Sequence, residues 1–223
     1  MVKIAATLKS SLIDYPDKIS YVIFFQGCNL RCSWCSNSEL LSRNPLFKKY
    51  LNEDDIILYL VENLKWYDGV VLLGGEPTIQ DNLEDFCLKL KKTTGLPIKL
   101  DTNGLKPQVV KNLIKKQLID YVAVDIKLGT IFLEDYQETK NYLINSGFPH
   151  EFRLTCVPTE IQDINIGAIL KTFKKAQKIY LQNFSNKNTF DKKFKKEEPY
   201  LDSIIKEWCL KYSKELEINL IQR

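Results

Sequence analysis

Short apolar runs alternate with longer amphipathic stretches along most of this chain of 223 residues. Near-continuous apolar runs are typical of strands buried on both faces, and apolar residues three and four apart are typical of helices. Six strand-then-helix units in succession predict a parallel sheet with right-handed crossovers. The expected strands are 21–26, 69–73, 98–101, 121–126, 151–157 and 179–182, and the expected helices are 54–64, 83–92, 108–116, 134–145, 166–176 and 200–215.

The predicted fold class is α/β, with a partial (β/α)6 barrel of the TIM type, because a full barrel needs two more strand-and-helix units than the sequence offers. The length suits one sizeable domain, so residues 1–223 are expected to form a single domain. Its core is expected at about 18–183. Residues 184–223 are expected to form a C-terminal loop, a helix and an edge strand at 217–221.

Composition and charge exclude several other classes of protein. Hydrophobic residues make up 44% and charged residues 27% of the chain, which are globular proportions rather than those of a disordered segment. The longest uncharged apolar stretch near the N-terminus, 21–25, is far too short to span a bilayer, so no membrane partner is expected. The net charge of +4 is too small for nucleic-acid binding by bulk charge, and no nucleic-acid partner is expected. These features predict a soluble, cytoplasmic protein.

Polar and glycine-rich segments follow five of the predicted strands directly. In an α/β barrel the carboxyl ends of the strands form the face where the chemistry is assembled. Because all of these segments fall on that one rim, the sequence predicts the functional site there. The segments are Cys28, Gly74-Gly75-Glu76-Pro77, Asp101-Thr102-Asn103-Gly104, Asp125 with Lys127, and Gln182-Asn183.

Three of the six cysteines, Cys28, Cys32 and Cys35, lie in one loop with the spacing C-x3-C-x2-C. Thiolates are soft ligands that select iron–sulfur clusters, zinc and copper(I). A structural zinc site takes four protein ligands, whereas a 4Fe–4S cluster held by three thiolates has one iron with an open coordination position. We therefore predict such a cluster, held by these three cysteines. The alternatives are chance clustering of core cysteines and a zinc site completed by Cys156 or His150.

The cysteine spacing, with Trp34 before the last cysteine, resembles the signature of radical S-adenosylmethionine (SAM) enzymes. The run Gly74-Gly75-Glu76-Pro77 is similar to their glycine-glycine-glutamate-proline motif. Further segments resemble the short anaerobic ribonucleoside-triphosphate reductase activating proteins, which are glycyl-radical activases. The resemblance runs from about residue 10 to about residue 183, in blocks at 11–16 (SLIDYP), 25–29 (FQGCN), 74–80 (GGEPTIQ), 100–104 (LDTNG), 121–127 (YVAVDIK) and 151–158 (EFRLTCVP).

Two departures from the family's pattern stand near these motifs. Ser36-Asn37-Ser38 follows the third cysteine where family members usually have histidine, asparagine and proline, and Asp17 replaces the usual glycine after Tyr15-Pro16. They leave the expected cluster ligands intact but bear on how the cluster loop packs or meets a partner. Residues 36–73 contain no cysteine, so the ferredoxin-like insert of larger glycyl-radical activases is not expected here.

The resemblance implies two cofactors, a 4Fe–4S cluster and SAM, which would bind the open iron through its amino and carboxylate groups. One electron from the reduced cluster would cleave a carbon–sulfur bond of SAM and yield methionine and a 5′-deoxyadenosyl radical. In the activases that radical abstracts a hydrogen atom from a glycine of a large partner enzyme. The implied partners are an anaerobic ribonucleotide reductase as protein substrate and an electron donor of the flavodoxin or ferredoxin type.

The resemblance also implies that residues at the strand ends bind SAM. The peptide groups of Gly74 and Gly75 would reach the methionine amino group, with Glu76 as its charge partner. The alternatives are a plain Gly-Gly turn before a helix and a Glu76 that only orients this turn. The other residues expected to bind the cofactor are Trp34, Asp101, Asn103, Asp125, Lys127, Arg153 and Gln182.

Three of these assignments have a structural alternative. An unpaired buried carboxylate is costly, so Asp101 and Asp125 each need a cationic or metal partner. They are expected around the methionine and ribose, with Lys127 meeting the carboxylate of SAM, or else in an internal Asp–Lys ion pair. Arg153 is expected either to contact the cofactor carboxylate or to pair with Asp125.

The remaining unusual residues have simpler expectations. Cys87, Cys156 and Cys209 are expected to be small core residues. His150, which follows Pro149, is expected in a solvated loop. The lysine-rich run 187–196 is expected to be an exposed loop, for which docking of a partner is a hypothesis.

The leading functional prediction is an activase that installs a glycyl radical on an anaerobic ribonucleotide reductase. One alternative is a small-molecule radical enzyme that resembles 7-carboxy-7-deazaguanine synthase, with Ser36 and Ser38 as polar groups near the cluster loop. Another is a non-catalytic metal-binding module. Zinc bound without iron would exclude both enzymes.

Overall fold

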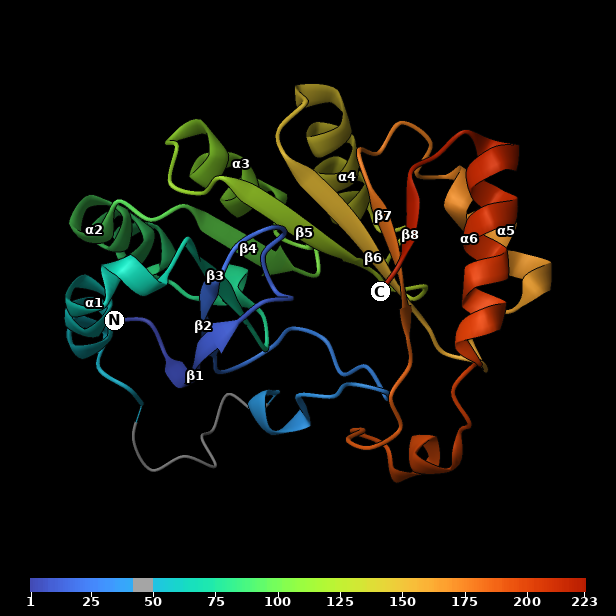
Figure 1. The fold of residues 1–223 in the computed structure, drawn as a ribbon, viewed down its shortest axis with the longest axis horizontal. Helices are drawn as coiled ribbons and strands as arrows, with labels where there is room; N and C mark the ends of the chain where they lie inside the picture. Colours follow the sequence, from blue (N-terminus) through green and yellow to red (C-terminus); the bar gives the residue numbers. More distant parts are fainter. Residues whose placement is uncertain (42–49) are drawn as a thin grey trace. The chain divides into compact units, whose positions relative to one another are not determined.

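The computed structural model describes residues 1–41 and 50–223 (Figure 1). Strands and helices alternate along the chain, as the sequence pattern predicts. The strands are β1 (Ile4–Ser11), β2 (Ser20–Phe25), β3 (Gly69–Gly74), β4 (Ile98–Thr102), β5 (Tyr121–Ile126), β6 (His150–Cys156), β7 (Ile179–Asn183) and β8 (Leu220–Gln222). The helices are α1 (Glu53–Glu62), α2 (Leu83–Thr94), α3 (Pro107–Lys115), α4 (Glu134–Ser146), α5 (Asp163–Lys171) and α6 (Asp202–Leu216).

The strand order in the sheet is the chain order, from β1 to β8. Strand β1 runs antiparallel to β2, whereas the pairs β2–β3, β3–β4, β6–β7 and β7–β8 are parallel. Parallel strands that neighbour each other in chain order, with helices between them, have the topology of a TIM-type barrel. The prediction of an α/β fold with a partial barrel of this type is therefore confirmed.

The described residues group into two compact units. The first comprises 1–31, 37–102 and 106–122, and the second comprises 32–36, 103–105 and 123–223. The expectation of a single domain over 1–223 stays a prediction. The cysteine motif contributes to both units, because Cys28 belongs to the first and Cys32 and Cys35 belong to the second.

The core of the first unit is built on its two most apolar strands. Strands β2 and β3 pair in register, so that Val22 lies beside Val71 and Ile23 beside Leu72, and all four side chains are buried. Helix α1 packs against α2, and the Phe86 ring of α2 meets the Phe25 ring edge to face at 5.9 Å between centroids. These apolar runs are buried on both faces, as the sequence indicates.

The core of the second unit is rich in aromatic rings. The rings of Phe152 on β6 and Phe173 lie 4.9 Å apart, and Tyr136 on α4 meets Phe173 at 6.4 Å. Helix α6 packs against β7, β8 and α5, and its Trp208 meets Tyr200 at 4.9 Å. Strands β6 and β7 pair in parallel up to Cys156 and Asn183 at their carboxyl ends.

The differences from the expected elements have local causes. Strand β1 was not predicted because its middle residues are exposed, as suits a strand at the edge of a sheet. Helix α5 begins earlier than expected because Gln162 and Asn165 form a capping box, and it ends at Lys171 rather than at 176. The expected edge strand is β8, which begins only at Leu220 because Glu217 ends α6 in the left-handed conformation (φ 53°).

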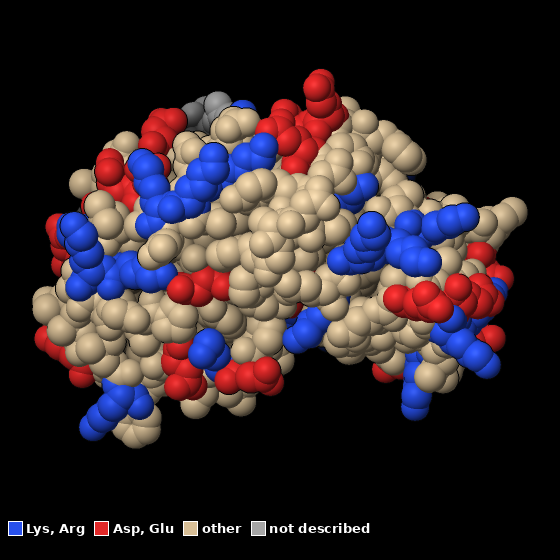
Figure 2. Space-filling view, turned by 90° about the horizontal axis from the view of Figure 1, so that it is seen from above, with Lys and Arg blue, Asp and Glu red and all other residues tan. Residues whose placement is uncertain are grey.

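The surface of the described residues agrees with the low net charge. Figure 2 shows Lys and Arg side chains intermingled with Asp and Glu side chains on one face of the molecule. This mixture is what a net charge of +4 among 32 basic and 28 acidic residues predicts. In the part of the chain that the structure describes, no helix is long and apolar enough to cross a membrane.

Candidate functional site

Two glycines at the end of β3 lie against the backbone that leads into the cysteine loop. Gly74 has a φ of 128°, and a Cβ there would stand 2.3 Å from the backbone nitrogen of Phe25. A Cβ on Gly75 would stand 2.0 Å from the carbonyl oxygen of Gly27. Only glycine fits at either position. The two glycines therefore let this turn lie close to the backbone that leads into the cysteine loop. The contact of their peptide groups with SAM stays a prediction.

Hydrogen bonds fix the same junction inside the first unit. The backbone N–H of Gly75 donates to the carbonyl of Phe25 at 2.9 Å, and the N–H of Glu76 donates to the carbonyl of Gly27 at 2.8 Å. The N–H of Gly27 in turn donates to the carbonyl of Leu40 at 2.7 Å. The start of the cysteine loop is thus bound to the Gly-Gly-Glu-Pro turn.

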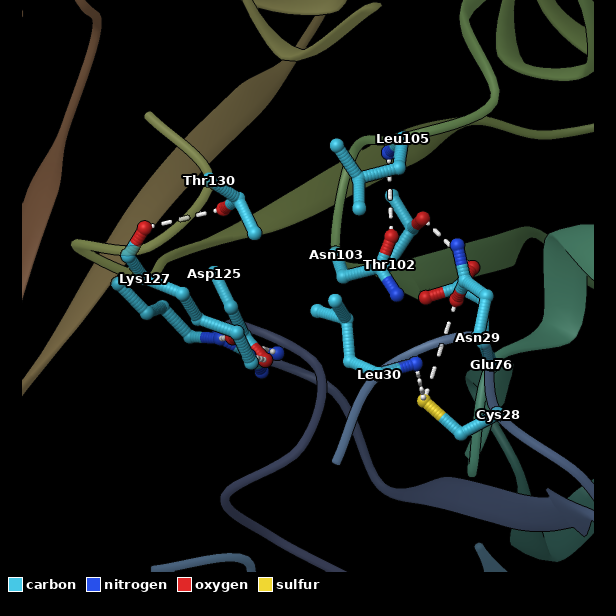
Figure 3. Close-up of polar contacts among 11 residues, drawn as sticks. Cys28, Asn29, Leu30, Glu76, Thr102, Asn103, Leu105, Asp125, Lys127 and Thr130 are labelled. Carbon is cyan, nitrogen blue, oxygen red and sulfur yellow. Dashed lines mark hydrogen bonds and ion pairs between the residues drawn. The ribbon is translucent and has the colours of Figure 1, made fainter. Parts of the chain in front are cut away.

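The carboxylate of Glu76 is 1% exposed and accepts hydrogen bonds from two threonines. Its Oε1 accepts from the N–H and the hydroxyl of Thr78, at 3.1 and 2.5 Å. It also accepts from the hydroxyl of Thr102 at 2.7 Å; Figure 3 shows Glu76 and Thr102. These bonds compensate the cost of burying a carboxylate. Glu76 therefore orients the turn and ties it to the end of β4, which is the alternative that the sequence left open. Its role toward SAM stays a prediction.

Cys28 lies in the first unit, immediately after the glycine junction. Its side chain is 8% exposed, its sulfur accepts a hydrogen bond from the N–H of Leu30 at 3.3 Å, and it contacts Oδ1 of Asn29 at 3.9 Å (Figure 3). The Arg31 guanidinium donates to the carbonyl of Cys28 at 2.8 Å. These contacts within the loop fix the position of the Cys28 sulfur.

Cys32 and Cys35 lie in the second unit, on a short turn. The N–H of Cys35 donates to the carbonyl of Cys32 at 3.1 Å. The indole N–H of Trp34, between them, donates to Oε1 of Glu160 at 2.9 Å, and Nζ of Lys127 lies 5.5 Å from the centre of the indole ring. The carbonyl of Ser33 accepts a hydrogen bond from the backbone N–H of Asp191 at 2.8 Å. Contacts within the second unit therefore hold this turn in place.

None of the six cysteines forms a disulfide bond. Among the described residues, no three His, Cys, Asp or Glu side chains are gathered as a metal site. The donor set nevertheless fits a 4Fe–4S cluster, because three cysteine thiols in one loop can supply three ligands, which would leave one iron without a protein ligand. The assignment of Cys28, Cys32 and Cys35 as the ligands stays a prediction.

His150 was expected in a solvated loop, and that prediction is wrong. It lies at the start of β6 and is 1% exposed. Its Nδ1 lies 2.7 Å from the carbonyl of Phe148, and its Nε2 is 3.4 Å from the backbone N–H of Gln177. Burial lowers the pKa of the imidazole, although the bond to Phe148 opposes this. With both ring nitrogens engaged, His150 is not placed to complete a zinc site.

Asp125, at the end of β5, is held by two cations of the second unit. Its Oδ2 pairs with Nζ of Lys127 at 2.7 Å, and its Oδ1 accepts from Nε and Nη2 of Arg153 at 3.0 and 2.8 Å. Burial alone would raise the pKa of Asp125, but the charges of Arg153 and Lys127 hold it well below its usual range. Burial would likewise lower the pKa of Lys127, but Asp125 and Cys32 raise it.

Asp101, at the end of β4 in the first unit, also has a cation beside it. Nζ of Lys99 lies 2.5 Å from its Oδ1, and the two side chains are 0% and 6% exposed. Asp101 and Asp125 each form an ion pair with a lysine, Lys99 and Lys127 respectively. This is the internal Asp–Lys pairing that the sequence analysis gives as the alternative to SAM binding. Their contacts with SAM, and those of Lys127 and Arg153, stay predictions.

The other residues expected at the cofactor lie at the ends of strands or just beyond them. Oδ1 of Asn103 accepts from the N–H of Leu105 at 3.1 Å and thereby stabilises the turn after β4 (Figure 3). The Thr130 hydroxyl donates to the carbonyl of Lys127 at 3.0 Å and supports the segment after β5. Gln182 is half-buried near the end of β7, beside Thr155 of β6.

The three scattered cysteines are core residues, as expected. All are buried, and burial raises the pKa of Cys87 and Cys156 to about 12 and that of Cys209 to about 11. The lysines of the run 187–196 are exposed, and Lys192–Lys196 form a short 3-10 helix. Docking of a partner on this run stays a prediction.

Glu160 is the polar residue near the cysteines that the sequence did not single out. It lies in the turn between β6 and α5, and it is separated from Trp34 by 126 residues in the chain. No motif surrounds it, so only the three-dimensional structure reveals the contact. The sequence places Thr102 at the end of a strand but does not predict its bond to Glu76, and it does not single out Lys99, the cation beside Asp101.

Comparison with known proteins identifies the family. The family model of the radical SAM superfamily matches residues 22–162. The chain belongs to the radical SAM superfamily. Its cofactors are accordingly a 4Fe–4S cluster and SAM.

Among the relatives of this radical SAM protein, one from Methanocaldococcus jannaschii bears the name "Putative glycyl-radical enzyme activating enzyme MJ1227". The two are 35% identical over 204 residues, which are 83% of this chain and 81% of the relative. A 7-carboxy-7-deazaguanine synthase of Clostridium acetobutylicum is 26% identical over 125 residues, which are 56% of this chain and 54% of that protein. The chain is therefore homologous to glycyl-radical enzyme activating enzymes and also to a deazaguanine synthase.

The fold of this radical SAM protein is similar to that of solved structures. The crystal structure of SuiB from Streptococcus suis, bound to the precursor peptide SuiA, matches with a TM-score of 0.66 at 18% identity. The match covers 91% of this chain and 48% of that chain. This chain thus spans about half the length of SuiB, and the likeness supports the fold alone.

Proposed function

We propose that this radical SAM enzyme is a glycyl-radical activase whose protein substrate is an anaerobic ribonucleoside-triphosphate reductase. The observation that carries the activity is the 35% identity over 83% of the chain with a protein named as a glycyl-radical enzyme activating enzyme. The choice of the reductase rests on the sequence blocks from 11–16 to 151–158 that resemble the reductase activases.

In this proposal Cys28, Cys32 and Cys35 hold the 4Fe–4S cluster. When bound, the reduced cluster would give one electron to SAM, which would yield methionine and a 5′-deoxyadenosyl radical able to take a hydrogen atom from a glycine of the partner. The protein has to fix the position of SAM and keep water and other hydrogen donors away. The electron donor that we propose is a protein of the flavodoxin or ferredoxin type.

Charged groups at the strand ends support a role in binding SAM, which carries a carboxylate, an amino group and a sulfonium. Lys127 and Arg153 are assigned to the carboxylate, and Glu76 and the peptide groups of Gly74 and Gly75 to the amino group. Because Asp125 holds both cations in place, they need little rearrangement to meet an anion. Asp101, Asn103, Gln182 and Trp34 complete the proposed set, with Gln182 toward the adenosine.

The test begins with anaerobically reconstituted, reduced protein and low-temperature EPR. Addition of SAM should change the shape of the cluster signal, since SAM binds the open iron. Addition of an anaerobic ribonucleotide reductase should then produce a glycyl-radical signal together with 5′-deoxyadenosine. A reductase whose radical-forming glycine is replaced by alanine serves as the control and should give no such signal. A cluster signal indifferent to SAM would refute the proposal.

The second candidate is a small-molecule enzyme related to 7-carboxy-7-deazaguanine synthase. The identity of 26% over 56% of the chain supports it. In that case the cluster signal would still respond to SAM, but no reductase would acquire a glycyl radical. Incubation with a pterin-sized substrate would instead form a deazaguanine product in a reaction that requires SAM. The two candidates are therefore distinguished by the product that forms: a glycyl radical on the reductase or a deazaguanine.

A further inference from the structure

We propose that Glu160 is a positioning residue that holds Trp34, and through it the segment Cys32–Cys35. The indole N–H of Trp34 donates to Oε1 of Glu160 at 2.9 Å. Because Trp34 stands between the two cysteines, fixing its ring also fixes the backbone that carries both thiols. The inference rests on the cluster that the superfamily uses and does not depend on which substrate the enzyme acts on.

Glu160 is itself presented from a fixed turn. Its backbone N–H donates to the carbonyl of Val157 at 2.9 Å, and its carbonyl accepts from Nδ2 of Asn165 at 2.8 Å. Asn165 belongs to the capping box that begins α5, where its Oδ1 accepts from the N–H of Gln162 at 2.9 Å. The carboxylate therefore projects from a backbone that is bonded on both sides, which suits a rigid support better than a mobile side chain.

The face of the same indole ring is held by a cation. Nζ of Lys127 lies 5.5 Å from the ring centre, within the range of a cation–π interaction. Lys127 is in turn paired with Asp125, which also accepts from Arg153. The edge of the Trp34 ring therefore contacts Glu160 and its face contacts Lys127, and these two residues come from different parts of the second unit.

The electrostatics of Glu160 agree with this arrangement. Burial raises the pKa of its carboxyl group, while the hydrogen bond from Trp34 and the charge of Lys127 oppose the rise.

A backbone contact also holds the residue next to Trp34. The N–H of Asp191 donates to the carbonyl of Ser33 at 2.8 Å. The segment with two of the three expected cluster ligands is therefore anchored by both side chain and backbone. Groups hydrogen-bonded directly to metal ligands typically contribute 10- to 100-fold to metal affinity, and we expect Glu160, which acts through Trp34, at the lower end of that range.

The anchor itself is measured on the cluster-free protein by NMR of the indole N–H groups. The chain has three tryptophans, and Trp34→Phe assigns the signal of Trp34. Glu160→Ala should shift that signal and speed the exchange of its proton with solvent. Glu160→Gln should retain most of the protection, because its amide oxygen still accepts the bond. Glu198→Ala, at an exposed glutamate of the same unit, is the matched control and should change neither.

The effect on the cluster is measured as the rate at which an iron chelator strips the reconstituted protein. Glu160→Ala should lose iron about tenfold faster than the wild type. Glu160→Gln should stay within about threefold of the wild type, as expected for a neutral acceptor in place of a charged one. Thermal unfolding of the cluster-free variants separates this effect from a general loss of stability. If Glu160→Ala does not fold, Trp34→Phe carries the test, since it removes the donor of the same bond and should also speed iron loss.

Two results would overturn the inference. One is an indole signal that Glu160→Ala leaves unchanged, since the anchor would then not exist in solution. The other is a shifted indole signal with an unchanged rate of iron loss, which would make the bond a purely structural contact. Neither measurement uses SAM or a partner enzyme. A failure here is therefore distinguishable from a failure of the proposed activase function.

Discussion

The carbonyl oxygen of Gly27 lies against the position that the Cβ of any other residue at position 75 would occupy. A Cβ on Gly75 would be 2.0 Å from that oxygen and 2.6 Å from the carbonyl carbon. The obstacle is backbone, and the N–H of Glu76 binds the same oxygen, so it cannot move aside cheaply. We expect Gly75→Ala to lower the free energy of unfolding by about 3 kcal/mol or more.

Urea denaturation of the cluster-free protein measures this change. Gly129→Ala is the matched control, because a Cβ there meets nothing within 4 Å. Its free energy of unfolding should stay within about 0.5 kcal/mol of the wild type. If Gly75→Ala were as stable as Gly129→Ala, the two backbones would not be in contact in solution.

Much of the fold could be predicted from the sequence because the strands are buried on both faces. Strands such as β2 and β5 are near-continuous apolar runs, and their bounds were predicted within a residue. Strand β1 lacks this pattern, since exposed residues fill its middle. The prediction of a solvated loop at His150 is wrong because a lone histidine after a proline resembles a loop residue, whereas both ring nitrogens of this imidazole contact the backbone of Phe148 and Gln177.

The chemistry of the site could be predicted from the cysteine spacing, but its internal partners could not. A sequence indicates that Asp125 needs a cation, yet both Lys127 and Arg153 were candidates for SAM as well as for Asp125. Which cation pairs with which carboxylate depends on how strands that are distant in the sequence align in the sheet. The contact between Trp34 and Glu160 spans 126 residues, and no periodicity of the sequence carries that information.

Thr102 of β4 donates its hydroxyl to the buried carboxylate of Glu76 at 2.7 Å. Thr102→Val keeps the shape of the side chain and removes this donor. Since hydrogen bonds to charged groups are worth about 1.5–3 kcal/mol, we expect a loss of stability of that size. Thr93→Val, at an exposed threonine of α2, should change the stability by at most about 0.5 kcal/mol. Equal unfolding curves for the two variants would show that the bond to Glu76 does not stabilise the turn.

His150 gives the stability of the protein a defined dependence on pH. Its pKa is lowered from 6.5 in the folded protein, chiefly by burial. The unfolded chain therefore binds the proton first, so the contribution of His150 is complete above pH 6.5 and is lost as the pH falls toward the folded pKa. We expect the free energy of unfolding to fall between pH 7 and 5.5 in the wild type.

His150→Asn isolates this contribution, because it removes the titrating group and leaves a polar side chain at the turn. The difference in the free energy of unfolding between wild type and variant should shrink as the pH falls through that range. Chemical denaturation at a series of pH values measures it. A difference that stays constant with pH would mean that the imidazole titrates alike in the folded and unfolded chains.

The buried pair of Lys99 and Asp101 provides the last test. Lys99→Met takes away the cation beside the buried carboxylate of Asp101 and should destabilise the cluster-free protein by about 3–5 kcal/mol. The double variant with Asp101→Leu removes both charges and should be more stable than Lys99→Met alone. Denaturation of the two variants beside Asp101→Leu completes the double-mutant cycle. If the losses of the single variants simply added, the two side chains would not be coupled, and Asp101 would be stabilised by groups other than Lys99.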